Sequence, residues 1–174
     1  MGTRDEAGFE EFVAARSDDL LRTAVLLTRD RGHAEDLLQT ALVKAYRRWN
    51  KISSADPYPY VRRILVTSAA SWRRLRTTQE IVSLPARDVP GPDANDGFAD
   101  REQMADALAT LPPRMRAVLV LRYAEDLSEA DTADLLGCSV STVKSQTQRG
   151  LARLREHLGT PRLTAGTAAV LEEC

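Results

Sequence analysis

The sequence predicts an all-α protein in which two small helical domains are joined by an acidic linker containing proline and glycine. The 174-residue chain is 43% hydrophobic and only 5% aromatic, a composition typical of globular helical proteins. Apolar residues recur at spacings of three and four over most of its length. Residues 77–100 lack this period and hold three prolines, two glycines and five carboxylates, so they are predicted to be a flexible linker.

The first domain is predicted to span residues 1–76 and to contain three helices. Residues 6–28 form an amphipathic helix, and a turn at residues 28–32 separates it from a second helix that continues to Asn50. Two prolines and a Ser-Ser pair predict a loop over residues 50–60. The inner stripe of the third helix is predicted to comprise Val61, Ile64, Leu65, Ser68, Ala69, Trp72 and Leu75.

The second domain, predicted over residues 101–158, contains a helix-turn-helix. Its four helices are expected at residues 101–110, 113–124, 128–136 and 139–158. Ser128 and Asp131 resemble a capping box at the start of the third of these helices. Gly137 suits the left-handed conformation at the end of that helix, and Ser139 can cap the next one. The short turn between these two helices matches a helix-turn-helix.

The last helix is predicted to present a polar face to solvent. Its inward residues are expected to be Val140, Val143, Leu151 and Leu154. Its outward residues are expected to be Ser141, Thr142, Lys144, Ser145, Gln148 and Arg149. Hydrogen-bonding and basic side chains of this kind suit base edges and phosphates, so DNA is the predicted ligand. The alternative is that these residues only face water, because short helical hairpins with a glycine turn occur in many helical proteins.

The formal net charge of −1 conceals a strong segregation of charge along the chain. Residues 41–76 carry nine basic side chains and one acidic side chain, which gives this block a net charge of +8. Residues 77–113 carry a net charge of −5. The basic block could face a polyanion, so the near-neutral total does not argue against DNA binding.

The sequence gives little support to an enzyme, a metalloprotein or a membrane protein. No P-loop, HExxH or nucleophile-elbow motif is present. Cys138 and Cys174 are not in CxxC spacing and only two histidines are available, so no disulfide, metal or cofactor is expected. With no apolar stretch of membrane-spanning length and no apolar signal core, a cytoplasmic protein is expected. Residues 159–174 are predicted to be a frayed tail.

Two segments of the chain resemble the extracytoplasmic-function, or group IV, sigma factors of bacterial RNA polymerase. Region four of that family is similar to residues 111–155, LPPRMRAVLVLRYAEDLSEADTADLLGCSVSTVKSQTQRGLARLR. Region two is similar to residues 34–52, AEDLLQTALVKAYRRWNKI. The resemblance covers residues 6–158 and points to a small actinobacterial branch. It implies a non-enzymatic sigma factor that binds core RNA polymerase and promoter DNA and directs transcription initiation.

Region two, here residues 1–76, is implied to bind core polymerase and to recognise and melt the minus-ten element. The polymerase-binding residues by this resemblance are Asp36, Leu38, Gln39 and Leu42, although the two leucines can also be explained as core. The residues matched to capture of minus-ten DNA are Tyr58, Tyr60, Arg62, Arg63, Thr67, Ser71, Trp72, Arg73 and Arg74. For the aromatic members a place in the core is an equal alternative. Many relatives carry Asn where this chain has Thr67, which leaves the minus-ten base preference open.

Region four, here residues 101–158, is implied to read the minus-thirty-five element as a duplex. Arg122 matches a family position that reaches the phosphate backbone. The recognition helix is matched by Lys144, Ser145, Gln148 and Arg149. Arginine can pair with guanine through two hydrogen bonds, so Arg149 is predicted to specify a base. Lys144 suits a base or a phosphate.

The resemblance also bears on partners. Many relatives are held by an anti-sigma factor, so such a partner is an expectation for this chain, together with a monomeric free state. A second hypothesis is a stand-alone helix-turn-helix repressor or activator whose first domain dimerises or senses a ligand. That class has no need of Asp36 and Gln39 on one helix followed by an arginine-rich helix.

Overall fold

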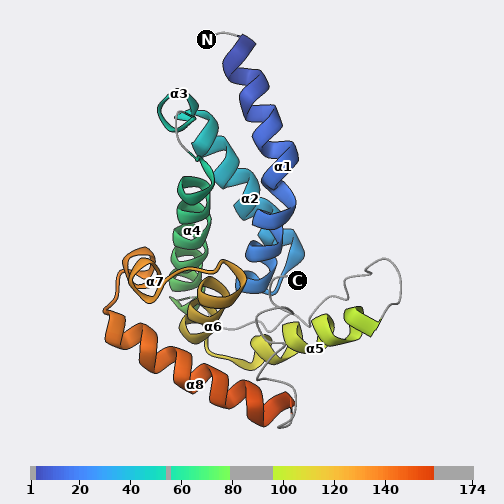
Figure 1. The fold of residues 1–174 in the computed structure, drawn as a ribbon, viewed down its shortest axis with the longest axis vertical. Helices are drawn as coiled ribbons and strands as arrows, with labels where there is room; N and C mark the ends of the chain where they lie inside the picture. The colour runs from blue at the N-terminus through green and yellow to red at the C-terminus, as the bar shows by residue number, and fades with distance from the viewer. Residues whose placement is uncertain (1–2, 54–55, 79–95, 159–174) are drawn as a thin grey trace. The chain divides into compact units, whose positions relative to one another are not determined.

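The computed structural model describes residues 3–53, 56–78 and 96–158, with side chains for 6–53, 56–70 and 102–158 (Figure 1). Its helices are α1 (Thr3–Thr28), α2 (Arg31–Tyr46), α3 (Trp49–Ile52), α4 (Tyr58–Thr78), α5 (Asp96–Thr110), α6 (Pro113–Leu119), the π-helical turn η1 (Val120–Ala124), α7 (Glu129–Leu136) and α8 (Val140–Leu158). The chain divides into two compact units, Met1–Arg87 and Asp88–Cys174. The predicted all-α fold is confirmed. Within the described ranges, no helix has the length and apolar character needed to cross a membrane.

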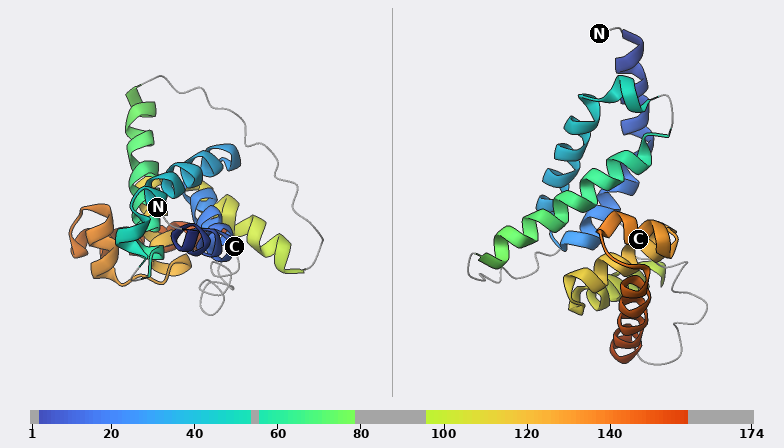
Figure 2. Two further views of the ribbon diagram at one scale, coloured as in Figure 1. Left: turned by 90° about the horizontal axis from the view of Figure 1, so that it is seen from above. Right: turned by 90° about the vertical axis from the view of Figure 1, so that its left-hand side faces the viewer.

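The first unit is built from α1, α2 and α4, which lie side by side (Figures 1 and 2). Their shared core includes the fully buried Leu20, Leu27 and Leu65. The break between α1 and α2 falls at a left-handed residue, Arg29, whose φ is 63°. Asp30 then caps α2, because its Oδ1 accepts a hydrogen bond from the backbone N–H of His33 at 2.9 Å.

The expectation of one continuous helix up to Asn50 is wrong. α2 ends at Tyr46, and Trp49 begins the separate short helix α3. The Trp49 side chain is only 5% exposed, and its ring lies 5.1 Å from that of Phe9 and 5.5 Å from that of Phe12, between centroids. The apolar period therefore continues beyond the end of α2 because α3 anchors an indole against α1, not because the helix itself continues.

The loop predicted over residues 50–60 is shorter at both ends, since α3 extends to Ile52 and α4 begins at Tyr58. Pro59 fits the first turn of α4 because a backbone N–H at that point has no partner within a helix. The Oδ1 atom of Asp56 accepts a hydrogen bond from the Tyr58 N–H at 3.0 Å, which holds the chain as it enters α4. Of the predicted inner stripe, Val61, Leu65 and Ala69 are buried, Ile64 and Ser68 are half-buried, and Trp72 and Leu75 lie outside the described side chains.

The second unit packs α6 and α8 closely together. A Cβ added at Gly150 of α8 would lie 2.8 Å from Leu119 Cδ1, so glycine permits this close approach. α5 begins at Asp96 rather than near residue 101, which shortens the predicted linker. Two of the five carboxylates that indicated a linker, Asp96 and Asp100, belong to the sequence of this helix, and acidic residues are favourable near a helix N-terminus.

Arg116 ties α5 to α6 through a buried guanidinium group. Its side chain is 6% exposed, and its Nε donates to the carbonyl of Leu108 at 2.9 Å. Its Nη2 donates to the carbonyls of Leu111 at 2.9 Å and Ala109 at 3.3 Å. Arg116 of α6 thus donates to carbonyl groups at and just after the end of α5, where a helix leaves its last carbonyls without intrahelical partners. These hydrogen bonds join two of the helices against which α8 packs.

Candidate nucleic-acid interface

The helix-turn-helix consists of α7, α8 and the capped turn between them (Figure 1). Ser128 caps α7, since its Oγ accepts from the Asp131 N–H at 3.0 Å and lies 2.5 Å from Asp131 Oδ2. Gly137 ends α7 at a φ of 63°, in the left-handed region. Ser139 Oγ accepts from the Thr142 N–H at 3.1 Å and so caps α8. The predicted turn chemistry is therefore confirmed at each of these positions.

The residues on the polar face of α8 differ in their exposure to solvent. Ser141, Lys144, Gln148 and Arg149 are exposed, whereas Thr142 and Ser145 are half-buried. The Thr142 hydroxyl lies 2.8 Å from Ser139 Oγ, and the Ser145 hydroxyl donates to the Thr142 carbonyl at 3.0 Å. Thr142 and Ser145 are thus bonded locally at the start of α8. Ser141, whose hydroxyl lies 2.9 Å from Ser139 Oγ, is also bonded locally but remains exposed.

Lys144 has a carboxylate partner on the neighbouring helix. Its Nζ lies 3.7 Å from Oε2 of Glu129, the first residue of α7, while 60% of the lysine side chain remains exposed. An exposed ion pair of this kind contributes little to stability. This ion pair places the Lys144 ammonium group near the start of α7. A phosphate group that bound Lys144 would have to compete with the Glu129 carboxylate.

The expectation that Val140 packs inward is wrong. It is 39% exposed, whereas Val143 and Leu154 are fully buried as expected and Leu151 is half-buried. The interior beside α7 is already filled by Val143, which packs with Val118 and Ala133. Val140 lies one turn earlier, at the first position of α8.

Arg122 is held within its own unit. It belongs to η1, is half-buried, and its Nη1 donates to the carbonyl of Leu127 in the segment before α7. The Nε atom of the same guanidinium group is buried as well.

In the first unit, an aromatic and arginine cluster lies at the start of α4. Tyr58 is half-buried, and the guanidinium carbons of Arg62 and Arg16 lie 5.6 Å and 5.3 Å from its ring centroid. Both distances are within the range of cation–π attraction. The sequence reasoning missed Arg16, because it lies on the acidic first helix and no spacing rule connects it with Tyr58.

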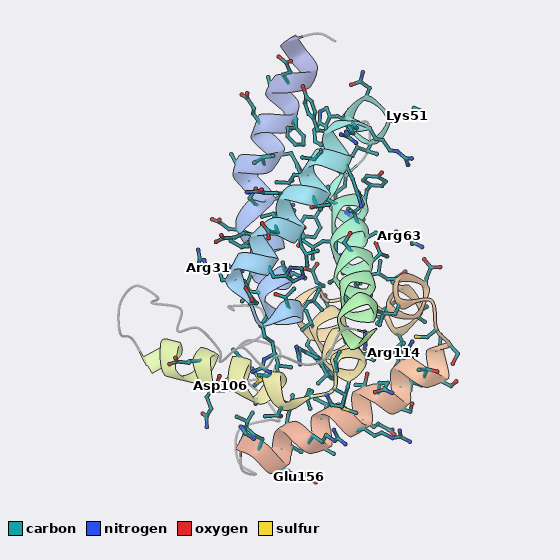
Figure 3. The ribbon with its side chains drawn as sticks, turned by 180° about the vertical axis from the view of Figure 1, so that it is seen from behind. Arg31, Lys51, Arg63, Asp106, Arg114 and Glu156 are labelled. Carbon is teal, nitrogen blue, oxygen red and sulfur yellow. The ribbon has the colours of Figure 1, made fainter. Side chains whose placement is uncertain are left out.

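The remaining minus-ten candidates are distributed along α4. Tyr60 is half-buried, whereas Arg63 and Thr67 are exposed, and Figure 3 shows the Arg63 side chain directed away from the bundle. The Thr67 hydroxyl lies 2.7 Å from the Arg63 carbonyl and 3.1 Å from that of Ile64, so its proton is directed to its own helix. Four further candidates, Ser71, Trp72, Arg73 and Arg74, lie on α4 but outside the described side chains.

The polymerase-binding candidates on α2 also separate by exposure. Asp36 and Gln39 are exposed, Leu42 is half-buried, and Leu38 is 8% exposed. Leu38 is therefore a core residue. Asp36 and Gln39 lie three positions apart on one face of α2. Within the described ranges, no group of His, Cys, Asp or Glu side chains is placed to hold a metal ion.

These features define a two-part helical DNA-binding protein, with a helix-turn-helix in one unit and a basic, aromatic helix start in the other. Residues 101–154 match the family described as Sigma-70, region 4, and residues 12–79 match Sigma-70 region 2. The chain is 44% identical over 153 residues to the RNA polymerase sigma-E factor of Streptomyces coelicolor. The matched region covers 86% of this chain and 85% of that protein.

A second relative is the ECF RNA polymerase sigma factor SigM of Mycobacterium tuberculosis, 32% identical over 157 residues, with 89% of this chain and 79% of that protein covered. Among solved structures, the fold is similar to the sigma factor RpoE in complex with the anti-sigma factor NepR from Bartonella quintana. That match has a TM-score of 0.72 and 27% identity, and covers 88% of this chain and 98% of the other.

The chain therefore belongs to the extracytoplasmic-function sigma factors. It is an RNA polymerase sigma factor that directs transcription initiation, it binds core RNA polymerase as sigma factors do, and it is not an enzyme. The hypothesis of a stand-alone repressor or activator is replaced by this assignment.

Proposed function

We propose that the two units of this sigma factor perform separate tasks on the promoter. Residues 1–76 bind core polymerase and capture the minus-ten element as single-stranded DNA. Residues 101–158 read the minus-thirty-five element as a duplex. Residues 77–100 contain the connection between them, although α5 already begins at Asp96. Both tasks require the polymerase and the chromosome, so the protein acts in the cytoplasm. It is a monomer until it binds core polymerase.

The observation that carries the duplex-reading role is the exposed face of α8. Ser141, Lys144 and Gln148 are spaced by three and four residues and so share one face of the helix, with Arg149 beside them. The N-terminal part of a recognition helix is the part that meets base edges in the major groove. Arg149 would specify guanine through a bidentate contact, and Lys144 would bind a phosphate or a base.

The minus-ten role is supported by the cluster around Tyr58. Single-strand capture combines aromatic surfaces for bases with cations along the backbone path. Tyr58 supplies the ring, and Arg16 and Arg62 supply two cations from different helices. An open hollow of about 460 Å³ is lined by Arg16, with Phe12, Trp49 and the carboxylate of Glu11 also in its wall, and is large enough for a base turned out of the stack.

The polymerase-binding role is assigned to Asp36 and Gln39, with Leu42 at their edge. Carboxylate and amide groups on one exposed helix face can accept and donate hydrogen bonds to a basic partner. Leu38 is excluded from this surface because it is buried in the first unit.

Run-off transcription with purified core polymerase, beside a direct core-binding assay, tests this assignment. Wild-type protein should bind core and yield discrete transcripts from promoter-containing fragments. Asp36→Ala combined with Gln39→Ala should weaken core binding at least tenfold, about 1.4 kcal/mol. Glu35→Ala is the matched control, since Glu35 is a neighbouring exposed carboxylate held by Arg31 at 2.9 Å. Equal loss in both variants would contradict the assigned surface.

An anti-sigma factor is a further proposed partner. The similar RpoE structure was solved in complex with one, which supports a comparable regulator for this chain. Such a protein should bind the free sigma factor and compete with core polymerase for it. Co-purification from the native host, followed by competition in the core-binding assay, would identify it, whereas a bound protein that leaves core binding unchanged would not qualify.

A further inference from the structure

Val140 is an apolar side chain at the DNA-facing end of α8 that the proposed contacts leave unused. It is 39% exposed and is the first residue of the recognition helix. The nearby interior holds Val143, which is fully buried against Val118 and Ala133. An exposed, β-branched side chain beside a filled core is available for contact with a partner and has little rotamer freedom to lose.

The groups around Val140 are polar and already ordered. Ser139 Oγ lies 2.9 Å from Ser141 Oγ and 2.8 Å from Thr142 Oγ1, so three hydroxyl groups form a local network on either side of the valine. Lys144 follows one turn later. At this end of α8, Val140 is therefore an exposed apolar side chain with hydrogen-bonding and charged side chains around it.

We propose that Val140 contacts the C5-methyl group of a thymine in the minus-thirty-five element and so specifies a T·A pair at that position. The inference rests on the proposed role of α8 as the duplex-reading helix. N-terminal residues of a recognition helix reach base edges, and the thymine methyl is the apolar feature that the major groove presents. Ser141 offers only a hydroxyl group at this end of the helix. Thr142 does carry a methyl group, but it is half-buried, so Val140 is the more exposed apolar side chain.

The test uses holoenzyme assembled from the full chain and core polymerase. Holoenzyme first selects duplexes from a library that is random across the minus-thirty-five positions. In the selected sequence, each thymine is then replaced in turn by deoxyuridine, which lacks only the methyl group. At one position the wild type should lose about fourfold in affinity, the effect of burying one methyl group. Val140→Ala should show a clearly smaller penalty at that position, because it loses both γ-methyl groups of valine and keeps only the Cβ.

The matched control is Val43→Ala, which truncates a valine that is 51% exposed on α2 in the other unit. Its thymine-to-deoxyuridine ratio should equal that of the wild type, because a ratio between two duplexes is independent of core affinity. The inference is overturned if Val140→Ala retains the wild-type penalty at every thymine, or if the wild type shows no penalty. If holoenzyme selects no minus-thirty-five sequence, the proposed role of α8 itself fails.

Discussion

The two units present the side chains proposed to bind DNA in different ways. In the second unit, the candidate residues are all exposed on one capped helix, α8, so the helix geometry fixes the spacing between them. These residues are Ser141, Lys144, Gln148 and Arg149. In the first unit, Arg16 of α1 and Arg62 of α4 meet over Tyr58. A duplex offers base edges at fixed intervals, which a rigid helix can match. A single strand is flexible, and side chains brought together from several elements can enclose it.

The largest effect is expected from removing the buried arginine that stabilises the second unit. Arg116→Ala should lower the free energy of unfolding of that unit by about 2–4 kcal/mol, since several buried carbonyls lose a charged donor. Arg114→Ala is the control, because Arg114 is exposed near the start of the same helix (Figure 3).

Both tryptophans, Trp49 and Trp72, belong to the first unit, so tryptophan fluorescence follows that unit while far-ultraviolet circular dichroism follows both. Arg116→Ala should shift the circular dichroism transition and leave the fluorescence transition in place. A shift of equal size in both signals would mean that the two units do not unfold independently.

The next effect concerns base reading by α8. Arg149→Ala should weaken holoenzyme binding to the minus-thirty-five duplex by about 1–3 kcal/mol and relax specificity at one base pair. Arg153→Ala, one turn further along the same helix and also exposed, should cost much less at the same salt concentration. Unchanged affinity in Arg149→Ala would remove this residue from the reading face.

A smaller effect is expected at the cluster of the first unit. Arg16→Ala should weaken binding of holoenzyme to single-stranded minus-ten DNA by about 0.5–1 kcal/mol, through loss of one cation beside Tyr58. Arg22→Ala is well matched, because Arg22 and Arg16 both lie on α1 and both pair with Asp19. Titration with fluorescent oligonucleotides would separate the two variants, and equal losses would indicate only a general effect of charge.

The smallest effect is expected at the ion pair beside the recognition helix. Glu129→Gln releases Lys144 and removes a negative charge near the phosphates, so binding to all duplexes should strengthen by about 0.2–1 kcal/mol. The ratio of specific to non-specific binding should stay unchanged, because the added attraction is independent of sequence and strengthens both kinds of binding by the same factor. Glu156→Gln, near the other end of α8, should change neither quantity. Weaker binding to non-specific DNA in Glu129→Gln would show that the carboxylate positions the lysine rather than competing for it.

The contrast between the units also explains what the sequence could predict. The helix-turn-helix depends on local chemistry, so Ser128, Gly137 and Ser139 were identifiable from their types and spacing. The place of Val140 was not, because Val140 and Val143 are equally apolar and only packing against α6 and α7 decides which one is buried. The meeting of Arg16 with Tyr58 depends on how α1 packs beside α4, which no local pattern encodes.

The proposed division of tasks between the two units is tested most directly by open-complex formation on three promoters. One promoter is intact, one has a scrambled minus-ten element and one has a scrambled minus-thirty-five element. Holoenzyme carrying Tyr58→Ala should lose discrimination against the scrambled minus-ten promoter and keep it for the minus-thirty-five. Arg149→Ala should show the reverse pattern. If either variant changed discrimination at both elements equally, or at the element assigned to the other unit, the assignment of separate tasks to the two units would be contradicted.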